Sequence, residues 1–313
     1  MMLAGEPLVP LLAAAAATGL RSFKPQELAN VLWSMAALPI TGQEVAAAFG
    51  AAAEAAAGSL KVQELANTAW AVAALKLEQP SLVDALCAAA WAKVEHFKPQ
   101  GISNTLWALA AMRNLHLPLT AGLCAVAGLH IQEFNVQNVV NSIWAFAKLP
   151  AVAPRPLLEP LCAVARRTSG EFVPQHLANT LWSLATLRLQ HPPLVAALHS
   201  FTLQRVEGFN SQNVTNTLWS LATLESCDPE LQEALCYAVV DRVTSFNAQD
   251  LASGLWAVAA LGIWRPDTVK GLCRASRGQL AEFTAVGISN TAWALAVLCS
   301  GEGWQTAYPT NKK

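Results

Sequence analysis

Charged residues are scarce in this chain, and neither sign is in excess. They make up 13% of the 313 residues, and 20 lysines and arginines stand against 21 aspartates and glutamates, which gives a net charge of −1. A nucleic-acid-binding protein that relies on phosphate contacts carries a large positive excess. Any such binding here has to rest on a local stripe of charge or on contacts to the bases. The 54% hydrophobic content excludes a disordered chain.

Long hydrophobic runs and paired cysteines are also lacking. The most apolar tracts, Pro7–Leu20 and Val45–Ala57, are shorter than the roughly 20 residues that a bilayer requires, so we expect no membrane insertion. A secretory signal is the competing interpretation of the first tract, but Glu6 and the missing basic segment argue against it. Seven cysteines without a CxxC pair disfavour a secreted disulfide scaffold.

Catalytic signatures are absent from the sequence as well. It contains no phosphate-binding glycine loop, no HExxH and no GxSxG. The carboxylates are scattered and mostly follow the repeat described next. We therefore predict that the protein is not an enzyme and that it needs no cofactor or metal.

Tryptophan, by contrast, is abundant and periodic. Eight of the 11 tryptophans follow one another at steps of 37 residues, with a single step of 38. Asparagine stands three residues before seven of them, glutamine seven before, and phenylalanine ten before. A period of this length indicates a solenoid or a propeller. The series is Trp33, Trp70, Trp107, Trp144, Trp182, Trp219, Trp256 and Trp293.

The segment around each tryptophan has the pattern of an amphipathic helix. The unit FxPQxLANTLWALAxL shows no strand alternation, and its apolar residues cover a wide arc at 100° per residue. Pro25, Pro99 and Pro174 stand in the first turn, where a missing N–H is tolerated. We name this segment helix A.

A second apolar segment, helix B, separates successive A helices, as at 81–96, 193–207 and 228–244. Two helices in 37 residues form a hairpin that must stack on its neighbours to bury its faces. The extra residue of the 38-residue step falls within Pro150–Pro156. We predict an all-α fold, a right-handed α-solenoid of about eight 37-residue helical-hairpin repeats. It occupies residues 1–299 as one domain, with a first helix B at 6–21 and a polar tail at 300–313.

Cysteine or histidine recurs 20 residues before six of the tryptophans. Equivalent residues of stacked repeats lie roughly 8–10 Å apart, which is too far for a disulfide and for a common zinc ion. We therefore interpret the column as small residues that pack helix B. Its members are Cys87, Cys124, Cys162, His199, Cys236 and Cys273.

The tryptophan and asparagine columns each have two interpretations. The indoles either pack neighbouring repeats together or offer a platform on which bases stack, and we favour packing. Asparagine is unfavourable inside a helix, so its recurrence indicates a benefit. Its side chain either bonds a loop of the next repeat, which we favour, or binds a ligand with a periodic backbone.

A reader of base sequence has to vary between repeats, and two slots on one helix face suit that role. The slot six residues before the tryptophan is polar or small, and the slot two residues before it carries a hydroxyl in most repeats. Base-edge recognition and an ordinary helix N-terminus explain the first slot equally well. The candidates are Glu27, Glu64, Thr68, Thr105, Asn138, His176, Thr180, Asn213, Thr217 and Asp250.

Basic residues form an incomplete stripe near the end of helix B. Lys93, Arg205 and Arg242 share the slot 14 residues before the tryptophan. They are candidates for phosphate contacts. The alternative, which we slightly favour, is a set of cations that stabilise helix C-termini.

The repeated unit, as in Phe172–Leu187 and Phe209–Leu224, resembles the octotricopeptide and heptatricopeptide repeats of organellar proteins, and the period of 37 residues is closer to the latter. The resemblance covers about 8–298. It implies an α-solenoid that binds single-stranded RNA through helix A, at positions that differ between repeats. It also implies a mitochondrial or plastid location and a role in RNA stability, processing or translation; the chain shows no clear transit peptide.

Two functional hypotheses follow. The first is a monomeric, sequence-selective binder of single-stranded RNA that reads about one base per repeat, hence roughly eight nucleotides. The second is an armadillo-like scaffold whose asparagine ladder grips an extended peptide of a protein partner. The phased array and the resemblance favour the first, and the near-neutral charge favours the second.

Overall fold

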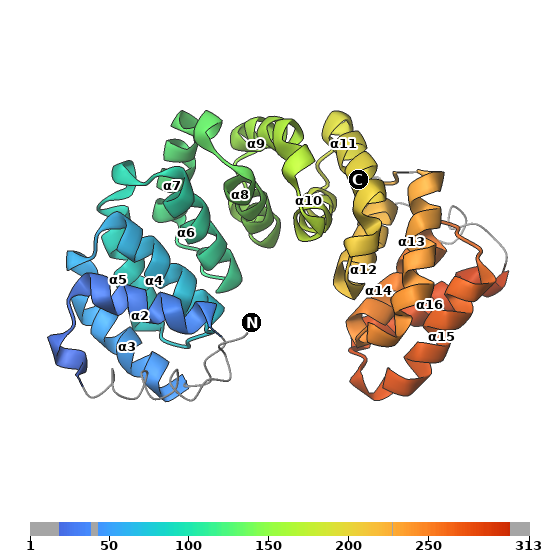
Figure 1. The fold of residues 1–313 in the computed structure, drawn as a ribbon, viewed down its shortest axis with the longest axis horizontal. Coiled ribbons are helices and arrows are strands. Elements are labelled where there is room, and N and C mark those ends of the chain that lie inside the picture. The colour runs from blue at the N-terminus through green and yellow to red at the C-terminus, as the bar shows by residue number, and fades with distance from the viewer. Residues whose placement is uncertain (1–18, 39–42, 227, 301–313) are drawn as a thin grey trace. The chain divides into compact units, whose positions relative to one another are not determined.

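A computed structural model describes residues 19–38, 43–226 and 228–300. These residues form α-helices and short 3-10 helices, and within them there is no strand. The predicted all-α solenoid of helical repeats is confirmed. The contacts group the chain into two units, Met1–Val164 and Ala165–Lys313, and each is described by itself (Figure 1).

The first unit contains four A helices and three complete B helices. The A helices are α2 (Pro25–Ala37), α4 (Val62–Ala74), α6 (Pro99–Ala111) and α8 (Val136–Lys148). The B helices are α3 (Gln43–Ala56), α5 (Pro80–Trp91) and α7 (Leu117–Leu129). The division between the units falls inside α9 (Arg155–Thr168).

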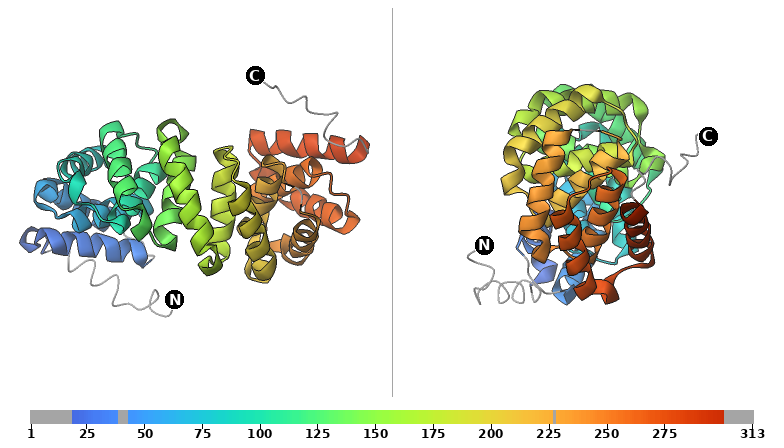
Figure 2. Two further views of the ribbon diagram at one scale, coloured as in Figure 1. Left: turned by 90° about the horizontal axis from the view of Figure 1, so that it is seen from above. Right: turned by 90° about the vertical axis from the view of Figure 1, so that its right-hand side faces the viewer.

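The second unit repeats the same alternation after α9. Its A helices are α10 (Pro174–Thr186), α12 (Ser211–Thr223), α14 (Ala248–Ala260) and α16 (Ala285–Ser300). Its B helices are α11 (Pro192–Arg205), α13 (Pro229–Arg242) and α15 (Pro266–Gln279). Figure 2 shows α16, the red helix, at the edge of this unit, and α16 packs against α14.

Within each unit the A helices pack on one another in one layer and the B helices form a second layer. The close A-to-A packing follows from the small residues on the facing sides, such as Ala66, Ala178 and Ala252, which are all buried. An apolar residue five positions before the tryptophan is at most 3% exposed in the first seven A helices, so it forms the centre of the core. These residues are Leu28, Leu65, Ile102, Val139, Leu177, Val214 and Leu251.

Two recurring backbone features terminate the helices. Each described B helix of a full repeat runs into a 3-10 turn, such as Val94–His96 or Val243–Ser245, and the next residue is the column phenylalanine or Leu60. Most A helices end at a residue with positive φ, six positions after the tryptophan. The amide of Leu77 then donates to the Val72 carbonyl, which closes the helix C-terminus.

The 38-residue step has a structural counterpart. Where five of the other repeats have the positive-φ residue, the connection after α8 contains a 3-10 helix, Pro150–Val152. Most of the predicted first helix B at 6–21 and nearly all of the tail at 300–313 lie outside the described residues, although Leu20–Ser22 form a 3-10 turn. The right-handed twist stays a prediction.

Candidate functional site

The A helices present one recurring polar face to solvent. Residues seven, three and zero positions from the tryptophan share a side of a helix. The glutamines are exposed in all seven A helices that carry them, and the asparagines are half-buried or exposed. We call these two columns the amide ladder. Its members are Gln26, Asn30, Gln63, Asn67, Gln100, Asn104, Gln137, Asn141, Gln175, Asn179, Gln212, Asn216, Gln249 and Asn290.

The tryptophans form a stack along the edge of the amide ladder. In the first unit the ring centroids of Trp70 and Trp107 are 6.1 Å apart, and those of Trp107 and Trp144 are 5.8 Å apart. In the second unit Trp256 lies 6.4 Å from Trp219 and 6.2 Å from Trp293. The six indoles are half-buried. The stacking supports the packing interpretation, and one edge of each indole stays open to solvent.

The variable slot six residues before the tryptophan is the third residue of helix A, and it caps the helix. Asn213 accepts a hydrogen bond from the Asn210 amide while Asn210 accepts one from the Asn213 amide. Asn138 and Asp250 form the same reciprocal pair with the residues that precede their helices. The polar residues of this slot therefore satisfy amides that would otherwise be unpaired.

Two members of the slot also bond the preceding A helix. The Asn138 Nδ2 donates to Ser103 Oγ at 3.0 Å, and Thr215 Oγ1 donates to Asp250 Oδ1 at 3.0 Å. Asn138, Asn213 and Asp250 are at most 6% exposed. A base edge cannot reach them, and we withdraw these three from the candidate RNA surface.

Glu27, Glu64 and His176 lie nearer to solvent in the same slot. The carboxylates of Glu27 and Glu64 accept from the Lys24 and Lys61 amides, both at 2.8 Å. His176 is half-buried beside Phe172, and desolvation lowers the pKa of its imidazole. These three residues remain predictions at the margin of the surface.

The hydroxyl slot lies between helices. Thr68, Thr105, Thr180 and Thr217 are at most 3% exposed. Two residues along an α-helix are separated by about 200°. The residue two positions before the half-exposed tryptophan therefore lies on the opposite, packed side of the helix. We therefore withdraw all four from the candidate RNA surface.

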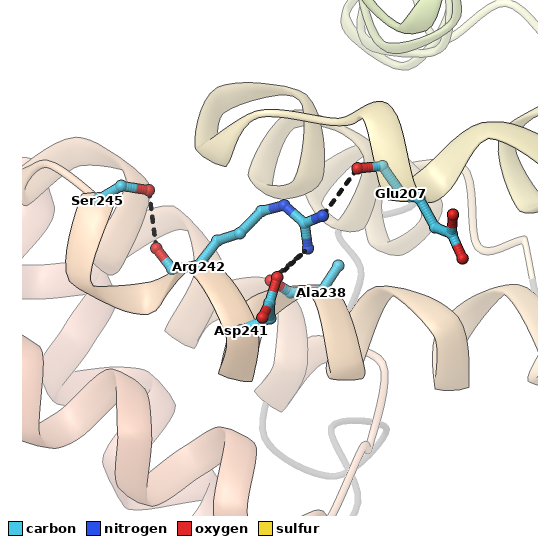
Figure 3. A network of polar contacts seen from close by, with 5 residues as sticks. All are labelled: Glu207, Ala238, Asp241, Arg242 and Ser245. Carbon is cyan, nitrogen blue, oxygen red and sulfur yellow. Dashed lines mark hydrogen bonds and ion pairs between the residues drawn. The ribbon is translucent and has the colours of Figure 1, made fainter.

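The basic slot holds adjacent repeats together. Lys93 Nζ donates to the carbonyls of Gly58 and Leu60, and Arg205 Nη2 donates to the Gly170 carbonyl at 2.7 Å. Arg242 Nη2 donates to the Glu207 carbonyl at 2.8 Å, and its Nη1 lies 3.0 Å from the Asp241 carboxylate (Figure 3). The carbonyls of Gly58, Gly170 and Glu207 lie in the 3-10 turns that follow the preceding B helices, and Leu60 directly follows its turn. The alternative of cations at helix C-termini thus describes these contacts better than a phosphate stripe.

A different set of lysines lies beside the amide ladder. Lys24, Lys61 and Lys98 are exposed residues that directly precede α2, α4 and α6. In the second unit the corresponding residues before α10, α12 and α14 are Val173, Asn210 and Asn247. Positive charge beside the ladder is therefore concentrated in the first unit.

The amide ladder contains a hollow of about 250 Å³ between α4 and α6. Gln63 and Asn67 line it from α4, and Gln100, Gly101 and Asn104 line it from α6. His96 and Lys98 contribute from the connection before α6. The hollow is thus built from ladder residues of two successive repeats.

The two ladder columns recur in the sequence but are not among the predicted site residues. The signal was present, because spacings of three and seven place the glutamine, asparagine and tryptophan on one helix face. What the sequence did not show was which side of the helix the packing leaves open. The lysines Lys24, Lys61 and Lys98 were visible as a shared slot in the same way.

The cysteine column packs the interior of the B layer. Cys87, Cys162 and Cys236 are buried. Desolvation raises the pKa of the Cys87 thiol to about 11 and that of Cys162 to about 12, which keeps both thiols protonated and unreactive near neutral pH. Within the described residues no group of three or more metal-ligating side chains comes together.

His199 completes that column and is also buried. Desolvation lowers the pKa of its imidazole, and the nearby Asp228 carboxylate, 3.4 Å from Nδ1, partly opposes the shift.

In the portion of the chain that the structure describes, no helix is both long and apolar enough to cross a membrane.

Two family models match parts of the chain. A model of a protein of unknown function matches residues 11–32, and no curated protein matches the chain. The family model of the RNA-editing substrate-binding complex 6 protein matches residues 51–302, which include the α4–α6 hollow and seven of the eight column tryptophans. The chain therefore belongs to the RNA-editing substrate-binding complex 6 protein family.

Proposed function

We propose that this protein binds single-stranded RNA along the amide ladder of its A helices. The observation that carries the proposal is the recurrence of a solvent-accessible carboxamide pair, such as Gln212 and Asn216, in successive A helices. The family description, an RNA-editing substrate-binding complex protein, supports RNA as the ligand. The role is binding without catalysis.

Carboxamides suit a single strand whose bases are not paired. Each amide both donates and accepts, so it can bond the edges of bases and the ribose hydroxyl. The half-exposed indoles add apolar contact at the edge of the ladder. The periodic ladder matches a periodic ligand, and we propose about one base per repeat, hence roughly eight nucleotides.

The sparse charge predicts a weak dependence on salt. Among the described residues, Lys24, Lys61 and Lys98 form the lysine column beside the ladder. For single-stranded nucleic acid, each neutralised phosphate contributes about −0.7 to the slope of the logarithm of the binding constant against the logarithm of salt concentration. We therefore expect the logarithm of the binding constant to fall with a slope of about −2 against the logarithm of salt concentration.

The cellular role is the finer part of the proposal. The likeness of the unit to octotricopeptide and heptatricopeptide repeats supports an action in a mitochondrion or plastid, in RNA stability, processing or translation, and we expect the protein to act as a monomer. The family description narrows this role to the binding of an RNA-editing substrate.

The test is fluorescence anisotropy with a labelled pool of random single-stranded RNA at low salt. The variant Gln212→Ala/Asn216→Ala/Gln249→Ala removes three ladder amides from the second unit, and it should weaken binding by about tenfold or more, because each lost hydrogen bond contributes about 0.5–1.5 kcal/mol. The control is Gln204→Ala, which removes an exposed amide from helix B; it should bind like the unaltered protein.

Failure of the unaltered protein to bind any RNA would contradict the proposal. The armadillo-like alternative makes a separate claim: protein partners should remain in a pull-down after nuclease treatment and be lost in the same triple variant.

A further inference from the structure

We propose that the hollow between α4 and α6 is a pocket for one unstacked adenine of the bound RNA. The proposal rests on the proposed function, because it assigns a base to one position along the amide ladder. The hollow measures about 250 Å³. This is slightly less than the volume of pockets that hold drug-sized ligands, as expected for a single base.

Two small residues meet at the hollow, where two other A-helix interfaces have larger polar residues. Between α6 and α8 the corresponding space contains the Asn138–Ser103 hydrogen bond. Between α12 and α14 it contains the Thr215–Asp250 hydrogen bond. Between α4 and α6 the equivalent residues are Gly101 and Ala66, both of which line the hollow.

The glycine at position 101 contributes to the pocket, because it places no side chain between α6 and α4. A Cβ atom built on Gly101 would lie 3.2 Å from Phe97 Cδ1 and 3.7 Å from Ala66 Cβ. The backbone there is ordinary α-helix within α6 and has no positive φ. Gly101 is the third residue of α6, and because its backbone does not require glycine, the missing side chain leaves space beside the ladder.

The side chains around the pocket match the edges of adenine. Gln63, Asn67, Gln100 and Asn104 surround it with four carboxamides. A carboxamide pairs with adenine through two hydrogen bonds, because its oxygen accepts from N6 and its nitrogen donates to N7. In residues 43–164 these four side chains form no hydrogen bond to other residues, so their donors and acceptors are available to a ligand.

The same lining disfavours guanine. The side chains that best recognise the O6 and N7 acceptors of guanine are arginine and lysine. The pocket lining has no arginine, and its single lysine, Lys98, lies at the helix start. We assign to Lys98 and the neighbouring His96 contact with the phosphate of the same nucleotide.

The experiment compares uridine 12-mers that carry one central adenosine, one central inosine or no substitution. Inosine keeps the purine shape but replaces the N6 donor with an acceptor. The unaltered protein should bind the adenosine 12-mer on the order of tenfold more tightly than the other two. The binding constants are measured by fluorescence anisotropy at fixed low salt.

The test variant is Gly101→Asn. Asparagine occupies this slot at Asn138 and Asn213, so the fold accepts it, and its side chain should fill the pocket. We expect Gly101→Asn to bind the adenosine and inosine 12-mers equally. Gly128→Asn is the matched control. Gly128 is an exposed residue of α7 at which an added Cβ would meet nothing within 4 Å, and the variant should keep the adenosine preference.

A second variant removes a carboxamide from the pocket lining without filling the pocket. Asn104→Ala should also lose the adenosine preference, and thermal unfolding of each variant checks that it is folded. Equal affinity of the unaltered protein for all three RNAs, or a preference that survives Gly101→Asn, would overturn the pocket while leaving RNA binding intact. Absence of binding to every RNA would overturn the proposed function itself.

Discussion

The two units build the same stack of A helices but start those helices differently. In the first unit Lys24, Lys61 and Lys98 precede three successive A helices, and none of them caps its helix with a side chain. In the second unit Asn210 and Asn247 form reciprocal caps with the third helical residue, as Asn135 does before α8 in the first unit. The lysine column and the α4–α6 hollow thus belong to the first unit, whereas between α12 and α14 of the second unit the Thr215–Asp250 hydrogen bond occupies the position equivalent to that hollow.

This difference teaches how a repeat protein can vary function without changing its fold. The slot six residues before the tryptophan either caps a helix and bonds its neighbour, as Asp250 does, or leaves space, as Gly101 does. The core columns stay the same in both units. The four predictions below test whether the units share their packing and differ only at these slots.

The largest expected effect concerns the feature that both units share. Trp107 and Trp256 each lie between two other column tryptophans. Trp107→Ala and Trp256→Ala should each lower the free energy of unfolding by about 3 kcal/mol, because each removes a large packed ring and leaves a void. Urea unfolding measures both.

Trp264→Ala is the control, because Trp264 is 63% exposed, and its cost should be about 0.5 kcal/mol or less. A cost below about 1 kcal/mol at Trp107 or Trp256 would show that the stack contributes little to the stability of that unit.

The next effect separates the units. Asp250→Ala should lower the free energy of unfolding by about 2 kcal/mol, because it removes a helix cap and leaves the buried Thr215 hydroxyl without its acceptor. Glu64→Ala in the first unit loses only the bond from the Lys61 amide at a more exposed site, and we expect about 0.5 kcal/mol. Equal losses in the two variants would remove the proposed distinction between the units.

A smaller and shared effect is expected at the basic slot. Arg242→Met should cost about 1 kcal/mol, because the Glu207 carbonyl loses a charged donor while the aliphatic part of the side chain is kept. Lys93→Met in the first unit should cost a similar amount. Both variants should keep their affinity for RNA. A large loss of RNA affinity without a loss of stability would restore the phosphate-contact role of these cations.

The smallest effect is a gain. Lys76, Arg113, Arg188 and Glu225 have φ between 50° and 54°, whereas Gly262 occupies the same position with φ 65°. Replacing any of the four by glycine should raise the free energy of unfolding by about 0.5–1 kcal/mol, because left-handed backbone is unfavourable for residues with a Cβ. Gly262→Ala should lower it by about 1 kcal/mol. Thermal unfolding measures these shifts, and a decrease in all four glycine variants would contradict the backbone argument.

The period of the tryptophans was enough to predict the stacked hairpins, because any chain that repeats one apolar pattern eight times has to bury it against itself. The position of the extra residue near Pro150 was also readable from the sequence. The site was harder. Thr68 and Gln63 are both polar and both recur, and only the direction of the neighbouring repeat decides that the threonine is buried and the glutamine is exposed. The hollow beside Gly101 depends on two residues 35 positions apart, Ala66 and Gly101, which pattern analysis treats separately.

The central claim is that RNA lies on the amide ladder, and photocrosslinking tests it most directly. Single-stranded RNA that contains 4-thiouridine is bound and irradiated, and the modified peptides are located by mass spectrometry. We predict adducts on peptides of the A helices that carry the ladder, including the α4 and α6 peptides around Asn67 and Asn104. Adducts confined to B helices such as α5 and α13 would contradict it.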